Sequence, residues 1–311
     1  MKKEANITVF AGGIGPEREI SLATGKALTE SLGKSFEARM LDLTEQRLPD
    51  GIDPNRSIVF PAIHGTFGED GTLQTMLEQR GFNYAGSGPD SSRLCMDKHE
   101  SKDVVRDAGI RVAQDIVFSD PKEIDPDQVL SELGQDLVLK PTDQGSSVAL
   151  YVVNGKDELT DALSAIGPGN WMIERRVFGR EVTLGILRDV PLGVVEVIPI
   201  GGVYDYERKY SAGTTEYRYP AVLSCEITNE LKEFAVKAFS ACGCRDFARV
   251  DFIISEDGQA HFLEINTLPG LTATSLLPKS ASCAGYDFDK LTVRLVEPAL
   301  ERFARGSLLS A

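Results

Sequence analysis

The stretch Phe247–Asn266, FARVDFIISEDGQAHFLEIN, decides the fold. Apolar and polar residues alternate on either side of Asp257-Gly258, and Asp-Gly between two alternating runs is a strong signal for a β-hairpin. With a two-residue turn at this pair, Asp251 lies directly opposite Glu264. Because side chains alternate along a strand, one face then carries the polar residues Arg249, Asp251, Glu264 and Asn266. The other face carries Val250, Phe252, Leu263 and Ile265.

Two carboxylates that face each other across a sheet repel, and a cation between them removes the conflict. Asp251, Glu264 and Asn266 offer the hard oxygen ligands that Mg2+ prefers, and protein-bound Mg2+ usually also bridges to substrate phosphate. A solvated polar face of an antiparallel sheet explains the same pattern. From the hairpin alone, both interpretations stay open.

The residues after the hairpin favour the metal site. They read Thr267-Leu268-Pro269-Gly270, with Thr272 and Ser275 shortly after. ARVDF followed by EINTLPG resembles the magnesium-binding end of the ATP-grasp ligases, and NTLPG resembles the D-alanine-D-alanine ligase family within them. The resemblance covers about residues 7–300 through separated motifs in the family's order, which chance rarely produces.

This resemblance implies an α/β fold of several domains, the ATP-grasp fold, in which ATP is clasped between two sheets. The implied units are an N-terminal parallel α/β substrate domain at 1–92, a central ATP-grasp subdomain at 93–179, and a C-terminal ATP-grasp and magnesium-binding domain at 180–311. The implied reaction joins two D-alanine molecules for peptidoglycan precursors, through an acyl phosphate. The implied cofactors are ATP and two Mg2+ or Mn2+ ions, and the implied assembly is a homodimer.

Composition limits the partners. A net charge of -14 over 311 residues argues against nucleic acid or an anionic membrane as the main partner. The start of the chain has no secretory apolar region, and no run is long enough to span a bilayer, so we expect a cytoplasmic protein. The five cysteines lack zinc spacing, and we expect buried reduced thiols.

The first motif lies near the N-terminus. An apolar run at Ile7–Ala11, a glycine loop and helical spacing over Glu17–Leu32 predict strand, loop and helix. Arg18 stands where a dinucleotide-binding fingerprint needs its third glycine, so that class is excluded. Glu17 in the first helical turn is also an ordinary dipole-compensating residue. GGxxxEREISL resembles the family's N-terminal loop, which implies that Glu17 contacts the amino group of the first D-alanine and joins a hydrogen-bond triad.

A second buried strand, Ser57–Pro61, leads to His64-Gly65-Thr66-Phe67-Gly68-Glu69-Asp70-Gly71. Glycine-rich loops at the carboxyl ends of parallel strands are where α/β folds bind ligands. A lone histidine would more often be structural. HGxxGEDG resembles the family motif in which His64 and Glu69 shape the pocket for the first amino acid.

Lysines and a small-residue loop mark the phosphate side. Met96-Asp97-Lys98 resembles the family's MDK motif, which implies that Lys98 reaches the ATP phosphates. Lys140 ends a buried strand, and the loop after it exposes backbone N–H groups and hydroxyls, as a phosphate nest or a simple turn would. KPxxxGSSV resembles the phosphate-covering loop, with Ser146 in the triad, Ser147 at the nucleotide, and Ala149 in place of a frequent glycine.

The adenosine side is predicted in the strand WMIER and the residues after it. The resemblance implies that Glu174 and nearby backbone groups, those of Arg175 and Val177, receive adenine. Glu181, seven positions after Glu174, then holds the ribose. Exposed glutamates flanking a turn explain the same spacing.

Tyr204–Tyr210, YDYERKY, resembles the family's mobile segment, although ordinary loop packing can produce such a stretch. Tyr210 takes the third triad position and implies an amine acceptor, whereas the vancomycin-resistance type makes D-alanyl-D-lactate. Lys209 would contact phosphate or the acceptor carboxylate. Ser275, otherwise a plain helix cap, and Leu276 resemble the acceptor-carboxylate site.

The implied mechanism needs positioning and charge neutralisation. Arg249 and the Gly270 amide would stabilise the oxyanion when the second amine attacks. We therefore expect Arg249→Ala to abolish peptide formation while leaving the fold intact. The alternatives are a carboxylate-amine ligase with another acceptor and a catalytically silent nucleotide-binding homologue.

Overall fold

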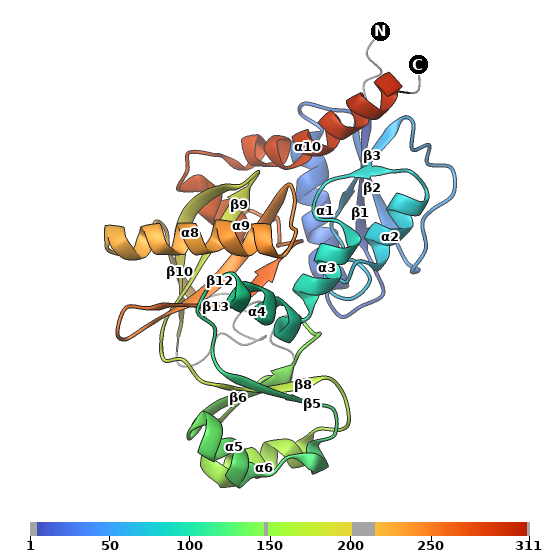
Figure 1. Ribbon diagram of the computed structural model, residues 1–311. Coiled ribbons are helices and arrows are strands. Elements are labelled where there is room, and N and C mark those ends of the chain that lie inside the picture. The colour runs from blue at the N-terminus through green and yellow to red at the C-terminus, as the bar shows by residue number, and fades with distance from the viewer. Residues whose placement is uncertain (1–4, 146–148, 201–214, 310–311) are drawn as a thin grey trace.

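The computed structural model describes residues 5–145, 149–200 and 215–309. These residues form three β-sheets, each covered by helices (Figure 1). One sheet is parallel and two are antiparallel, which makes the chain a mixed α/β protein. No helix within the described ranges has the length and apolar character needed to cross a membrane.

The N-terminal sheet is parallel and has the order β2-β1-β3-β4. Its two middle strands are buried almost throughout, which is why they read as continuous apolar runs. Helix α10 returns to this unit from the end of the chain and packs on α1, as Figure 1 shows. The elements are β1 (Asn6–Gly12), α1 (Arg18–Leu32), β2 (Ala38–Leu43), β3 (Ser57–Pro61), α2 (Thr72–Gln79), β4 (Asn83–Tyr84) and α10 (Phe288–Leu309).

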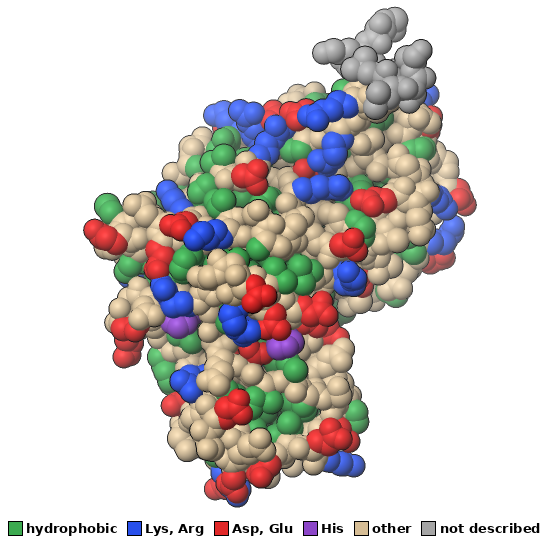
Figure 2. Space-filling view, in the orientation of Figure 1, with side chains coloured by type: hydrophobic (Ala, Val, Ile, Leu, Met, Phe, Trp, Pro, Cys, Tyr) green, Lys and Arg blue, Asp and Glu red, His purple; other side chains and the backbone are tan. Residues whose placement is uncertain are grey.

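The central sheet is antiparallel, with the order β5-β8-β6-β7. Helices α5 and α6 cover one face, and its other face is turned toward the C-terminal sheet (Figure 1). In Figure 2 this unit projects as a separate lobe below the rest of the molecule. Its elements are β5 (Asp115–Phe118), the short 3-10 helix η1 (Pro121–Glu123), α5 (Pro126–Leu133), β6 (Asp136–Pro141), β7 (Tyr151–Asn154), α6 (Gly155–Ala165) and β8 (Trp171–Arg175).

The C-terminal sheet is antiparallel, with the order β11-β10-β9-β12-β13. Helix α8 packs on one face together with α4, and α9 packs against β9 and β10. The elements of this unit, and the two helices that lead to it from the N-terminal sheet, are α3 (Pro89–Met96), α4 (Lys98–Asp107), β9 (Gly179–Leu187), β10 (Val190–Pro199), β11 (Thr215–Arg218), α8 (Cys225–Ala241), β12 (Phe247–Ser255), β13 (Ala260–Asn266) and α9 (Leu276–Ser282).

The hairpin β12-β13 pairs as predicted at its functional end. Asp251 lies opposite Glu264, and Arg249 lies opposite Asn266. The predicted two-residue turn is wrong. The Ser255 amide donates to the Gln259 carbonyl at 2.9 Å, so three residues form the turn, and its last residue, Gly258, has a φ of 84°. A three-residue turn that ends in a left-handed glycine is the next most common hairpin connection.

A β-bulge restores the register between the turn and the carboxylates. Phe252 pairs with Phe262, whereas Asp251 pairs with Glu264, so Leu263 is the extra residue. The prediction that Leu263 fills the core is therefore wrong. Phe262 is fully buried in the core, and Leu263 lies beside Glu264 on the opposite face.

The cysteines only partly follow the expectation of burial. All five are free thiols. Cys95 and Cys242 are buried in the core of the C-terminal unit, and Cys244 packs against them. Cys225 is exposed at the start of α8, and Cys283 is partly exposed.

Candidate active site

Two neighbouring cavities lie against the C-terminal sheet. The larger, about 410 Å3, lies between this sheet and the central sheet. The smaller, about 230 Å3, lies between the loops of the N-terminal sheet and the end of β13. Among the described residues, Lys98 and Glu264 line both cavities, and their charged groups are 3.6 Å apart.

The wall of the larger cavity includes a buried carboxylate held by two lysines. Glu174 on β8 binds Lys140 through Oε1 and Lys102 through Oε2. Burial alone would raise the pKa of Glu174, but the charges of Lys102 and Lys140 outweigh it and lower the pKa to about 2. An anionic hydrogen-bond acceptor therefore faces this cavity at neutral pH.

The walls of the larger cavity combine apolar and polar groups. Val138 and Leu263 supply apolar surface from the two facing sheets, and Glu181 adds a carboxylate from β9. Residues 175–179 close one side of the cavity, with Arg176 stacked on the Phe178 ring at 4.6 Å. A partly apolar cavity with a buried acceptor in its wall fits a purine ring.

Asp251 lies on the cavity face of β12 and is almost buried. Arg249 binds it with two parallel hydrogen bonds, from Nε to Oδ1 at 2.9 Å and from Nη2 to Oδ2 at 2.7 Å. The Thr183 hydroxyl also donates to Oδ1. The conflict between the facing carboxylates is therefore relieved by side chains, with Arg249 on Asp251 and Lys98 near Glu264.

Local structure fixes the position of Lys98 at the start of α4. The Asp97 side chain caps this helix by accepting hydrogen bonds from the His99 and Glu100 amides. The Thr142 hydroxyl donates to the same carboxylate, and the Lys98 amide donates to the Thr142 carbonyl at 2.8 Å. The helix cap thereby ties the lysine to the end of β6, beside the larger cavity.

The donor set at the end of the hairpin fits a magnesium ion. Asp251 and Glu264 supply two carboxylates on one face, and Asn266 adds a carboxamide whose Oδ1 accepts from the Leu268 amide at 2.8 Å and keeps a second lone pair. The described residues contain no group of three His, Cys, Asp or Glu that could hold a metal. An ion here would thus take its other ligands from water or phosphate, as Mg2+ commonly does.

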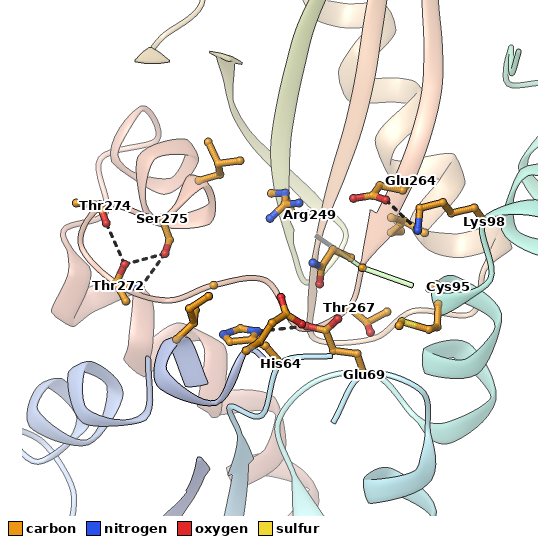
Figure 3. A pocket seen from close by; sticks show the side chains of 18 of the residues that line it. His64, Glu69, Cys95, Lys98, Arg249, Glu264, Thr267, Thr272, Thr274 and Ser275 are labelled. Carbon is orange, nitrogen blue, oxygen red and sulfur yellow. Dashed lines mark hydrogen bonds and ion pairs between the residues drawn. The ribbon is translucent and has the colours of Figure 1, made fainter. Parts of the chain in front are cut away.

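The smaller cavity is bounded by the loop after β3. His64 is buried, and its Nε2 lies 3.1 Å from the Thr24 hydroxyl. Its Nδ1 lies 3.2 Å from Glu69 Oε1 (Figure 3). Glu17, at the start of α1, lies close to Gly65, where a Cβ atom would come within 2.7 Å of its Oε2. The predicted residues of the first amino-acid pocket therefore come together on one wall.

The opposite wall is the loop that joins β13 to α9. Ser275 occupies the N-cap position of α9, but its side chain makes no capping hydrogen bond. Its hydroxyl instead accepts from the Thr272 amide at 3.1 Å and lies 2.9 Å from the Thr272 hydroxyl (Figure 3). A Cβ atom on Gly270 would approach the same hydroxyl to 3.0 Å. Ser275 is therefore the N-cap residue by position, as the helix-cap interpretation expected, but its hydroxyl does not cap the helix.

The predicted site residues divide between the two cavities. The larger cavity is lined by Lys98, Lys140, Glu174, Arg175, Val177, Glu181, Asp251 and Glu264. The smaller is lined by Glu17, His64, Glu69, Lys98, Arg249, Glu264, Asn266, Gly270, Ser275 and Leu276. The four remaining predicted residues, Ser146, Ser147, Lys209 and Tyr210, lie outside the described residues.

Several residues that line the site were not predicted as functional from the sequence. Cys95, Thr267 and Tyr217 line the smaller cavity, and Thr183 binds Asp251. Thr183 could have been predicted from the sequence, because it lies two residues after Glu181 on the same strand and so shares its face. Lys102 is fully buried and holds Glu174, whereas a lysine in a polar helix is normally solvated.

A nucleotide-sized cavity between two facing antiparallel sheets, with a parallel α/β unit beside it, places this chain among the ATP-grasp proteins. Comparisons with family models match residues 46–87 to the N-terminus and residues 104–297 to the C-terminus of D-ala D-ala ligase. The chain belongs to the D-alanine-D-alanine ligase family.

Curated relatives match over nearly the whole chain. A D-alanine-D-alanine ligase of Mannheimia succiniciproducens is 37% identical over 300 residues, which cover 95% of this chain and 98% of the relative. A ligase of the same name from Anaeromyxobacter is 39% identical over 298 residues, covering 94% and 96%.

Solved structures match the fold equally well. A Bacillus anthracis D-alanine-D-alanine ligase complexed with ATP superposes with a TM-score of 0.85 at 30% identity and covers 97% of this chain and 99% of its own. The VanG D-Ala:D-Ser ligase of Enterococcus faecalis has a TM-score of 0.84 at 27% identity, with 95% and 99% coverage.

Proposed function

We propose that this chain is an ATP-dependent ligase that joins two D-alanine molecules into D-alanyl-D-alanine for peptidoglycan precursor synthesis. The observation that carries the proposal is the wall shared by the two cavities, formed by Lys98 and Glu264. A nucleotide in the larger cavity and a small amino acid in the smaller would meet at this wall. Family membership supports the same reaction.

Transfer of the γ-phosphoryl group to the first D-alanine would take place at the shared wall. A carboxylate is a poor acceptor for an amine, since hydroxide leaves badly, and phosphorylation supplies a good leaving group. The carboxylate oxygen attacks the γ-phosphorus, ADP leaves, and D-alanyl phosphate forms. Phosphoryl transfer requires mainly positioning and charge neutralisation, which Lys98 and Lys140 would provide.

Asp251, Glu264 and Asn266 are the proposed ligands for two magnesium or manganese ions. Such ions, when bound, neutralise charge on the β- and γ-phosphates and orient them for in-line transfer. Arg249 holds the Asp251 carboxylate in place for this role, and the register of the hairpin keeps Glu264 opposite it.

The second D-alanine would enter beside the acyl phosphate. Ser275 and Leu276, at the start of α9, are the proposed site for its carboxylate, and both line the smaller cavity. Its uncharged amine attacks the acyl carbon and the carbonyl oxygen gains charge. The bond from the acyl carbon to phosphate then breaks, and the nitrogen gives up a proton to the departing phosphate. Arg249 and the Gly270 amide are the proposed donors to that oxygen.

The wall around His64 would bind the first D-alanine. Glu17 is the proposed partner of its ammonium group, and Glu69 with His64 shapes the pocket. From the sequence motifs we also propose roles for four further residues. Ser146 and Tyr210 would belong to the triad, Ser147 would contact the nucleotide, and Lys209 would contact phosphate.

The domain division at 1–92, 93–179 and 180–311 is supported by one sheet in each unit. The nucleotide and cell-wall chemistry supports a cytoplasmic location. The family resemblance supports a homodimer.

The acceptor needs a separate test, because a D-Ala:D-Ser ligase shares this fold at a TM-score of 0.84. We would measure ADP release with Mg-ATP and D-alanine, with L-alanine as the control, and identify products by mass spectrometry. Parallel reactions would contain D-serine or D-lactate at equal concentration. D-alanyl-D-alanine as the dominant product supports the proposal.

Two other outcomes would contradict it in different ways. A dominant D-alanyl-D-serine or D-alanyl-D-lactate product would keep the ligase mechanism and change the acceptor. ATP binding without ADP release that depends on D-alanine would indicate a silent nucleotide-binding homologue.

A further inference from the structure

Lys102 on α4 is a fully buried ammonium group outside both cavities. Its side chain is 0% exposed, and Nζ donates to Glu174 Oε2. Burying a lysine is costly unless an anion compensates it, and burial lowers the pKa of Lys102 despite the nearby carboxylate. Burying this ammonium group costs free energy, and the group contacts a residue that lines the larger cavity. Packing alone does not explain why a lysine occupies this position.

The two lysines on Glu174 differ in what else they face. Lys140 lines the larger cavity, where we place the phosphates, so nucleotide binding competes for its ammonium group. Lys102 lies between α4 and the central sheet, outside both cavities, and besides Glu174 the charged groups that act on it are Lys140 and then Asp115 on β5. Lys102 can therefore hold Glu174 Oε2 whether or not a nucleotide draws Lys140 away.

We propose that Lys102 is a positioning residue that keeps Glu174 an anionic hydrogen-bond acceptor and thereby makes the nucleotide cavity select a 6-amino purine over a 6-oxo purine. This inference rests on the proposed nucleotide site.

The selectivity follows from the hydrogen-bonding capacity of a carboxyl group. An ionised carboxylate only accepts, so it pairs with the 6-amino group of adenine and repels the 6-oxo group of hypoxanthine. A protonated carboxyl group also donates, and it can pair with the 6-oxo group. Without Lys102, burial would act against Lys140 alone, and Glu174 would lose part of its anionic character.

The test is equilibrium binding of Mg-ATP and Mg-ITP to wild type, Lys102→Met, Glu174→Gln and the double variant. Lys102→Met should weaken ATP binding by about tenfold or more, the order expected for a charged hydrogen bond, and weaken ITP binding much less. Glu174→Gln should lower the ATP-to-ITP ratio similarly, because its amide can donate. In the Glu174→Gln background, Lys102→Met should change this ratio little further.

The pH dependence and a surface variant provide controls. The ATP-to-ITP ratio should stay constant with rising pH in wild type and rise in Lys102→Met, as Glu174 becomes ionised again. Lys156→Met removes an exposed lysine that pairs with Asp127 on the same lobe, and it should keep the wild-type ratio.

Equal weakening of ATP and ITP by Lys102→Met would show a structural role only and overturn the inference. If that variant does not fold, a wild-type ratio in Glu174→Gln would overturn it equally, because Lys102 is proposed to act through Glu174. A wild-type chain that binds neither nucleotide would overturn the proposed function itself, which separates that failure from a failure of the inference.

Discussion

The Lys98 ammonium lies 3.6 Å from Glu264 Oε2, at the one wall that the two described cavities share. Both side chains are mostly buried, with 12% and 27% of their surfaces exposed. Their mutual attraction is therefore screened less than that of a surface pair. A phosphoryl group that passes from one cavity to the other would pass this cation and this anion.

Lys98→Met should lower kcat for dipeptide formation by about 100-fold or more, because a preorganised charge at the transferring group is lost. The fold should persist, because α4 keeps its Asp97 cap, at a stability cost of about 1 kcal/mol for the lost pair with Glu264. Steady-state kinetics and urea unfolding measure the two effects. Lys26→Met, at an exposed lysine of α1, is the control and should retain wild-type kcat. A kcat within twofold of wild type in Lys98→Met would remove the lysine from the mechanism.

Arg249→Ala should have two effects rather than the single one expected from the sequence. It removes a proposed oxyanion donor and also leaves Asp251, which is 8% exposed, without its bidentate partner. Breaking such a pair costs about 3 kcal/mol of stability. Arg249→Lys keeps a positive charge and should recover part of the stability but little of the ligation rate. Full activity in Arg249→Lys would contradict the need for the guanidinium geometry.

Glu174→Gln should reduce stability at neutral pH and less so in acid. The pKa of Glu174 falls from 4.5 to about 2 on folding, so its ionised form stabilises the fold fully above pH 4.5, and this contribution is lost as pH falls toward 2. The difference in unfolding free energy between wild type and Glu174→Gln should be a few kcal/mol at pH 7 and shrink below pH 4.5. Urea titrations at several pH values measure it. Glu100→Gln, at an exposed glutamate of α4, should show no such trend, and a constant difference for Glu174→Gln would refute the linkage.

Ala149→Gly should stabilise the chain. Ala149 has a φ of 53°, in the left-handed region that only glycine adopts without cost. Relief of this strain contributes about 1 kcal/mol, reduced by the greater freedom of glycine in the unfolded chain. Thermal unfolding should show a higher Tm. Ala304→Gly, within helix α10, should lower it, and a lower Tm for Ala149→Gly would show that the backbone strain is compensated locally.

Elements with strong local signals were predictable from the sequence. The bounds of β3 and β8 agree with the prediction, because each is a short apolar run with clear ends. The facing of Asp251 and Glu264 was also predictable, since alternation along two strands defines which side chains share a face.

Features that depend on distant residues were not predictable. The bulge at Leu263 results from packing of Phe262 in the core and from the three-residue turn, neither of which the alternation indicates. The burial of Lys102 depends on Glu174, 72 positions away, and no local pattern distinguishes it from a surface lysine. Arg249 was placed on the correct face, but its bidentate bond to Asp251 is visible only in three dimensions.

The bulge has a consequence for how this hairpin can change over evolutionary time. One extra residue in β13 absorbs the offset that the turn introduces, so the carboxylates keep their facing although the two arms differ in length. Insertions and deletions near the tip can therefore accumulate without moving Asp251 and Glu264, provided that the bulge shifts or disappears to match. Because of the bulge, Leu263 and Glu264 face the same cavity although they are adjacent in the chain. Substitutions at these two neighbouring positions can therefore change the apolar surface and the charge of that cavity separately.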